Sequence, residues 1–197
     1  LIVSRGLGDV YKRQLSYCLM EDCDILDWDL IDLTDDGSES TTSKAKKQKQ
    51  DMQKLSSTLF EKLQEKFDNC QIDHVIIENQ PVFKNPTMKS IQIMIYSFFA
   101  YKRAIEDRQI EAVTFVAANT KVKYAESHLQ KIGVEVEKCE NKYKYNKKIS
   151  IQCTSEIVQN HEELAEWFAN HKKRDDLADA FLLGLSYLER KCRSKKK

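Results

Sequence analysis

Apolar residues recur along this chain with the period of strands in some segments and of helices in others. From Leu15 the sequence LSYCLMEDCDILDWDLIDL places two short apolar runs around the acidic residues 21–24, which predicts a β-hairpin. Residues 74–81, HVIIENQP, form a short β-branched run closed by proline, typical of a buried central strand. Residues 111–118 predict a further strand.

Helical periodicity fills the intervals between and after these strands. Leu55, Leu59, Leu63 and Phe67 recur four residues apart and predict an amphipathic helix. The predicted helices cover about residues 55–69, 85–107, 121–132, 143–159, 162–170 and 173–192. A hairpin followed by alternating β and α elements indicates an α/β sheet with helices on its faces.

Three segments stand apart from this pattern. The first fourteen residues, LIVSRGLGDVYKRQ, resemble translated sequencing-adaptor sequence, so we treat residues 1–14 as non-native and exclude them from the fold prediction. Residues 34–53 are polar and predict a loop or disordered insert, and residues 193–197 form a basic tail. Residues 15–192 are then expected to form one domain around a single core.

Composition narrows the class of protein. No run of about 18 apolar residues exists, which argues against a membrane span. The six cysteines form no C-x-x-C pair, which favours free thiols in a reducing, intracellular compartment. Residues 15–80 carry 7 basic and 15 acidic side chains, whereas residues 81–197 carry 22 and 15. The basic second half suits a polyanionic partner, although a merely solvated surface has the same composition.

Two groups of carboxylates are candidates for chemistry. Glu78 lies inside an apolar strand, where a carboxylate is costly unless it is paired or bound to a metal; alternatively, it emerges into solvent at the strand end. In KKRDDLADAFLLGL, Asp176 and Asp179 share one helix face, with Asp175 four residues before Asp179. A divalent cation would relieve their repulsion, whereas the alternative is an acidic first turn favoured by the helix dipole.

Together these features resemble a known family. An apolar strand ending in Glu78-Asn79-Gln80-Pro81, a long apolar helix after it, and a C-terminal D-x-x-D-A followed by aliphatic residues are similar to Holliday-junction resolvases of the RuvC, fungal mitochondrial and poxviral type. The resemblance implies an RNase H-like mixed sheet flanked by helices. It implies Mg²⁺, with Mn²⁺ as a substitute, held by Glu78, Asp176 and Asp179, with Asp175 as an alternative to Asp176.

The resemblance is incomplete at the start of the chain. The family begins with a strand ending in Asp-x-Gly that supplies a fourth metal ligand. Asp9 stands in the expected register before Leu15, but Tyr11 replaces the glycine, so the first strand is expected to be replaced by non-native sequence. A strand ending in Asp-x-Gly directly upstream of Leu15 in the parent gene would restore this ligand. The family also uses a lysine near the scissile phosphate, for which Lys147 and Lys148 are candidates and Lys148 is our choice.

The implied function is a metal-dependent endonuclease that resolves four-way DNA junctions in recombination, repair or genome processing. Two alternatives stay open: an RNase H-like nuclease acting on another nucleic-acid structure, and a nucleic-acid-binding module without catalysis. Related resolvases are dimers that pair through the helix after the glutamate strand. We therefore expect a homodimer with Met94, Phe98 and Tyr101 at its interface, unless another helix of the same chain covers that flank.

Overall fold

The computed structural model describes residues 2–5, 14–33, 52–80, 86–106, 109–137, 139 and 141–194, with the backbone alone for residues 2–5 and 194. Asp9 and residues 34–51 of the predicted polar insert lie outside these ranges. The strands are β1 (Ile2–Arg5), β2 (Gln14–Glu21), β3 (Asp24–Asp32), β4 (His74–Asn79) and β5 (Ala112–Ala117). The helices are α1 (Met52–Phe67), α2 (Pro86–Ala104), α3 (Asn119–Lys131), α4 (Lys142–Val158), α5 (Glu162–Asn170) and α6 (Arg174–Ser194).

The five strands form one mixed sheet in the order β3-β2-β1-β4-β5. β1, β2 and β3 pair antiparallel in sequence, whereas β4 runs parallel to both β1 and β5. The turn of the predicted hairpin falls at Asp22 and Cys23, where Asp22 adopts a φ of 50°, a conformation that aspartate tolerates better than most residues. The mixed sheet flanked by helices that the sequence predicted is confirmed.

The fold prediction lacked one strand, because it excluded residues 1–14. Ile2–Arg5 forms the strand between β2 and β4, with Val3 opposite Cys18 on one side and Ile76 on the other. The physical reason is that ladder hydrogen bonds use backbone groups, which any residue except proline supplies, and the segment IVSR begins with two β-branched residues.

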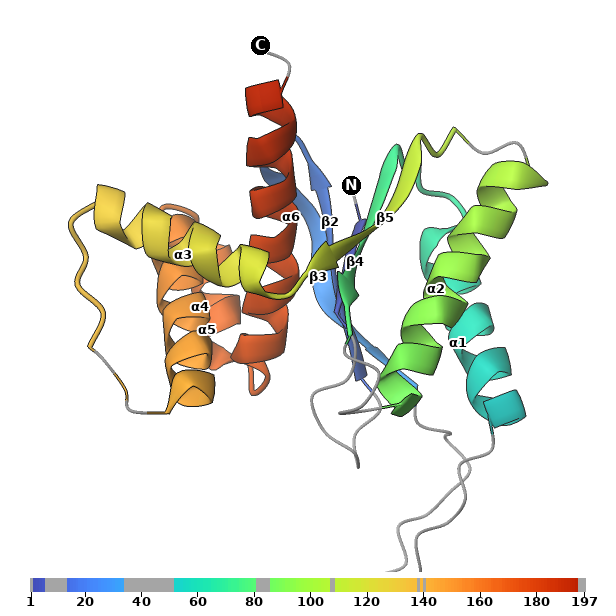
Figure 1. The fold of residues 1–197 in the computed structure, drawn as a ribbon, viewed down its shortest axis with the longest axis horizontal. Helices are drawn as coiled ribbons and strands as arrows, with labels where there is room; N and C mark the ends of the chain where they lie inside the picture. Colours follow the sequence, from blue (N-terminus) through green and yellow to red (C-terminus); the bar gives the residue numbers. More distant parts are fainter. Residues whose placement is uncertain are drawn as a thin grey trace, which may run out of the picture.

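Helices cover both faces of the sheet (Figure 1). On one face α1 and α2 pack over a core that includes Leu59, Val75, Ile77 and Phe99. On the other face α6 lies against the sheet, with α3, α4 and α5 outside it, over a core that includes Ile76 and Phe181. None of the described helices combines the length and the apolar composition that a membrane span requires.

The wide apolar stripe of α2 is covered on one side by α1. Phe98 is half-buried there, and its ring stacks on Phe60 of α1 with the ring centroids 5.8 Å apart. Other apolar residues of α2 stay exposed, with exposed fractions of 44% for Ile93, 37% for Tyr96 and 56% for Tyr101. The alternative that a helix of the same chain covers one flank therefore holds for Phe98, but Tyr101 remains on the surface.

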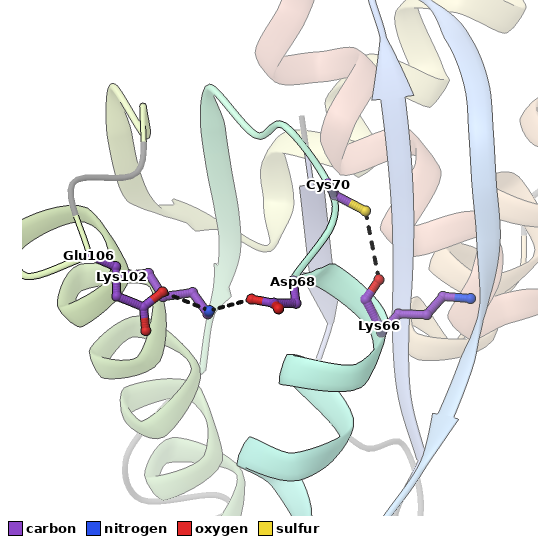
Figure 2. A network of polar contacts seen from close by, with 5 residues as sticks. All are labelled: Lys66, Asp68, Cys70, Lys102 and Glu106. Carbon is purple, nitrogen blue, oxygen red and sulfur yellow. Dashed lines mark hydrogen bonds and ion pairs between the residues drawn. The ribbon is translucent and has the colours of Figure 1, made fainter.

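A buried lysine joins the ends of α1 and α2 (Figure 2). The Lys102 side chain is 5% exposed, and its ammonium lies 3.2 Å from Asp68 Oδ1 and 3.0 Å from Glu106 Oε2. The same nitrogen lies 5.2 Å from the centroid of the Phe98 ring. The two carboxylates are more than a third exposed, so solvent screens part of each ion pair. Lys102 thus contributes both aliphatic packing and a charge shared by two elements.

We predict that Lys102→Ala lowers the free energy of unfolding by about 1–3 kcal/mol, because it removes buried aliphatic stem and two ion pairs together. Arg103→Ala is the matched control, since Arg103 is the exposed neighbour on the same helix, and should change stability by no more than about 0.5 kcal/mol. Urea unfolding followed by circular dichroism measures both. Equal effects of the two substitutions would contradict the proposed stabilisation by Lys102.

Candidate active site

Glu78 is the last buried residue of β4. Side chains alternate across a strand, so Glu78 lies on the same sheet face as Ile76, whose side chain belongs to the core beneath α6. The exposed fraction of Glu78 is 6%, so its carboxylate does not emerge into solvent at the strand end. A carboxylate buried to this extent needs a cation or several hydrogen-bond donors.

Asp176 and Asp179 lie in the first turns of α6, with exposed fractions of 7% and 6%. A hydrogen bond from the indole nitrogen of Trp28 on β3 to the Leu177 carbonyl, 3.0 Å long and buried, holds this end of α6 against the sheet. The Trp28 ring also stacks on Phe168 of α5, with the centroids 5.1 Å apart. Trp28 therefore holds the first turns of α6, which carry Asp179, against β3.

Lys121, from the first turn of α3, joins the two carboxylate groups. Its ammonium lies 2.7 Å from Glu78 Oε2 and 2.8 Å from Asp179 Oδ2, and the side chain is 6% exposed. Because both oxygens contact the same nitrogen at 2.7 and 2.8 Å, they are no more than about 5.5 Å apart. Residues 78 and 179, about 100 positions apart in sequence, thus share one buried cation.

Sequence reasoning missed Lys121, although one signal was available. The helix dipole disfavours a cation in the first turn of a helix, where Lys121 stands two residues after the start of α3. A lysine in that place directly after a strand therefore needs an acidic partner from elsewhere in the fold. Its partners, Glu78 and Asp179, could not be assigned without the sheet topology.

A cleft of about 510 Å³ opens beside this group. Its basic lining comes from α3 and α4, and both Glu78 and Asp179 reach it. Tyr143, in the first turn of α4, also lines the cleft and is 61% exposed. The lining residues that carry a charge or an aromatic ring are Glu78, Lys121, Lys123, Glu126, Lys142, Tyr143, Tyr145, Lys147 and Asp179.

The structure separates the two lysines proposed from sequence. The Lys147 ammonium lies in the cleft, 2.5 Å from Asp175 Oδ2 and 4.9 Å from the centroid of the Tyr143 ring. Burial lowers the pKa of Lys147, but hydrogen bonds with Asp175 and Tyr143 raise it above its ordinary value, so the ammonium stays charged. Lys148 is not among the residues that line the cleft, and its ammonium pairs with Glu137 at 2.5 Å.

The two neighbouring aspartates also differ in their surroundings. Asp175 is paired with Lys147, whereas Asp176 Oδ2 lies 4.0 Å from the Lys173 ammonium. Neither Asp175 nor Asp176 lines the cleft, although Asp176 is buried and shares a helix face with Asp179. The structure therefore brings Glu78 and Asp179 together and leaves Asp176 one helical turn away.

The donor set fits a hard divalent cation in kind. Two buried carboxylates share one cation, here the Lys121 ammonium, and carboxylate oxygens are the ligands that Mg²⁺ prefers. The number of ligands is too small for a complete site, because the described part of the chain holds no group of three or more His, Cys, Asp or Glu side chains able to bind a metal. A complete site would therefore need Asp176 to turn toward Glu78 and Asp179, or a further carboxylate from the segment before Leu15. The sequence candidate for that carboxylate, Asp9, lies outside the described residues.

The sheet order and the two helical layers define an RNase H-like fold, with buried carboxylates on β4 and α6. Residues 30–191 match the family model described as Poxvirus A22 protein, and the chain belongs to this family. An uncharacterized protein of Acanthamoeba polyphaga mimivirus is 33% identical to it over 133 residues, which are 66% of this chain. The chain spans 32% of the length of that relative.

Among solved structures, the chain is similar to the crystal structure of the yeast mitochondrial Holliday junction resolvase Ydc2. The TM-score is 0.63 at 18% identity, over 99% of this chain and 81% of that one. At this identity the likeness establishes the fold, which is the RNase H-like fold expected from sequence. Together with the family match, it confirms the resemblance to the Holliday-junction resolvases on which the sequence prediction rested.

Proposed function

We propose that the chain is a divalent-metal-dependent endonuclease that cuts four-way DNA junctions. The observation that carries the proposal is the buried Glu78 and Asp179 pair, which opens into a cleft lined by Lys121, Lys123, Lys142 and Lys147. Carboxylates of this kind hold a catalytic cation, and a lysine-rich wall binds the phosphates of a nucleic acid. Membership of the Poxvirus A22 protein family and the fold shared with a Holliday junction resolvase favour branched DNA as the substrate.

The proposed reaction is hydrolysis of a phosphodiester by water, which leaves a 5′-phosphate and a 3′-hydroxyl. When bound, Mg²⁺ or Mn²⁺ would activate the water and stabilise the charge that develops on the phosphate and on the leaving oxygen. Glu78 and Asp179 would hold the cation, with Asp176 as the further ligand from α6. Lys147, charged and inside the cleft, is a better placed candidate for contact with the scissile phosphate than Lys148.

The first strand is proposed to supply the remaining carboxylate. The β1–β4 register pairs Ser4 with Ile77, so the next position of β1, occupied by Arg5, lies level with Glu78. A native first strand ending in Asp-x-Gly would bring a carboxylate to this level of the sheet. Cleavage is therefore measured in a version of the chain whose first strand is taken from the parent gene.

In that version we predict that Glu78→Gln and Asp179→Asn each reduce Mg²⁺-dependent junction cleavage by more than about 100-fold, since even the outer partners of metal ligands are worth 10- to 100-fold. Junction binding in EDTA should remain. Denaturing gels of a four-way junction with one labelled strand measure cleavage, and gel shifts measure binding.

Glu126→Gln is the matched control, because Glu126 lines the same cleft but is exposed, and it should cleave within about threefold of the unaltered rate, as expected for a surface charge. Near-normal cleavage by Asp179→Asn would overturn the site assignment. Tight junction binding without cleavage at any Mg²⁺ or Mn²⁺ concentration would favour a binding module, and equal cutting of duplex or RNA–DNA hybrid would favour a different nuclease.

We also propose that the protein acts as a homodimer that pairs through the exposed side of α2. Ile93, Tyr96 and Tyr101 are exposed there, and the ring of Tyr96 stacks on Phe115 of β5 with the ring centroids 5.0 Å apart. β5 is the last strand in the sheet order, so this surface adjoins a sheet edge. A two-fold dimer would present two active sites to a junction, in which two strands must be cut.

We predict that Ile93→Lys weakens self-association more than tenfold, because a two-fold axis brings a charge into an apolar contact from both subunits. Ile132→Lys is the control, since Ile132 is similarly exposed, at 47%, but follows α3 on the other layer. Sedimentation velocity at micromolar concentration measures association, and circular dichroism checks the fold. A monomeric unaltered chain under these conditions would rule out the dimer.

A further inference from the structure

Lys121 is the most deeply buried cation beside the cleft, and its position is unusual for a lysine. Its ammonium contacts Glu78 and Asp179 at 2.7 and 2.8 Å, the side chain is 6% exposed, and its helix dipole disfavours a positive charge there. Burial alone would also expel a charged lysine. The two carboxylates therefore hold the ammonium in place against both effects.

We propose that Lys121 is an internal competitor for the divalent cation: metal enters the Glu78 and Asp179 pair by displacing the Lys121 ammonium into the cleft. The inference rests on the proposed function in that it concerns the same carboxylates. Geometry carries it, because one nitrogen contacts an oxygen of each carboxylate, and a cation bound by the same two oxygens cannot share that position. A divalent cation and an ammonium held by the same two carboxylates would also repel one another, because both are positively charged, so each excludes the other.

The displaced ammonium has a defined destination. Lys121 lines the cleft of about 510 Å³, which also carries Lys123, Lys142 and Lys147 and would hold the DNA phosphates. A phosphate there would accept the released ammonium, so DNA would promote metal binding by giving Lys121 a second partner. Because coupling between two ligands is reciprocal, metal would tighten DNA binding by the same factor. Lys121 would thus keep the site poorly loaded with metal until a substrate is present.

The test measures Mn²⁺ binding without any cleavage. Electron paramagnetic resonance of free Mn²⁺ gives the dissociation constant for the chain alone and for Lys121→Met, whose side chain keeps the aliphatic length without the charge. The expected result is at least tenfold tighter Mn²⁺ binding by Lys121→Met. Lys123→Met is the matched control: Lys123 lines the same cleft two residues away but is exposed, so its loss should change the constant by less than twofold.

A second readout covers the folding of the variant, because Lys121→Met removes the cation that two buried carboxylates share. Thermal unfolding in EDTA should show a lower Tm for Lys121→Met than for the unaltered chain, and Mn²⁺ should raise that Tm more than it raises the Tm of the unaltered chain. A Lys121→Met that folds only with Mn²⁺ supports the proposal in the same way. Lys121→Gln, which keeps a neutral donor, should give an intermediate Mn²⁺ affinity.

A third measurement tests the coupling. The protein is mixed with a four-way junction in Ca²⁺, in which the junction is expected to stay uncut, and is then titrated with Mn²⁺ on ice. The junction should tighten Mn²⁺ binding by the unaltered chain more than it tightens Mn²⁺ binding by Lys121→Met. Mn²⁺ binding that is equal or weaker in both Lys121 variants, or absent in all proteins, overturns the proposal. Metal-dependent cleavage with the same Mn²⁺ affinity in Lys121→Met and the unaltered chain would reject this inference and leave the proposed function standing. The expected changes in Mn²⁺ affinity without any cleavage would support this inference and reject the proposed function.

Discussion

Two buried carboxylates, one on β4 and one on α6, share a single cation, and the arrangement of the elements around the cleft depends on this contact. Glu78 comes from β4, Asp179 from α6 and Lys121 from α3, so three elements distant in sequence meet at one ammonium. Leaving either carboxylate without a cation in this place would cost several kcal/mol, more than most single contacts in a protein of this size contribute. Packing supports the arrangement, since Trp28 ties the first turn of α6 to β3.

The two layers of helices have separate tasks. α6 and the helices outside it form the layer that holds the carboxylates and the basic cleft, whereas α1 and α2 cover the opposite face of the sheet (Figure 1). Each layer has its own buried lysine with two acidic partners: Lys121 by the cleft, and Lys102 between α1 and α2 (Figure 2). The partners of Lys102 are substantially exposed and those of Lys121 are buried, so only Lys121 holds charges that water cannot stabilise.

Sequence patterns predicted most of the secondary structure, because the strands and helices bury regular apolar faces. Glu78 stood out as a charge in an apolar strand, and Asp176 and Asp179 as a pair on one helix face. Lys121 did not stand out, since its acidic partners are joined to it only by the fold. Ile2–Arg5 was also missed, because residues 1–14 were excluded from the fold prediction, whereas backbone pairing with β2 and β4 places this segment in the sheet.

We have proposed that Glu78 and Asp179 bind the divalent cation of a nuclease and that the Lys121 ammonium occupies this position when metal is absent. Anomalous diffraction from crystals soaked in Mn²⁺ tests this most directly, because it locates the metal independently of activity. We expect a peak about 2.0–2.6 Å from an oxygen of each carboxylate, the range for hard cations, with the Lys121 ammonium moved into the cleft. A metal bound elsewhere, with Lys121 still between Glu78 and Asp179, would contradict the account.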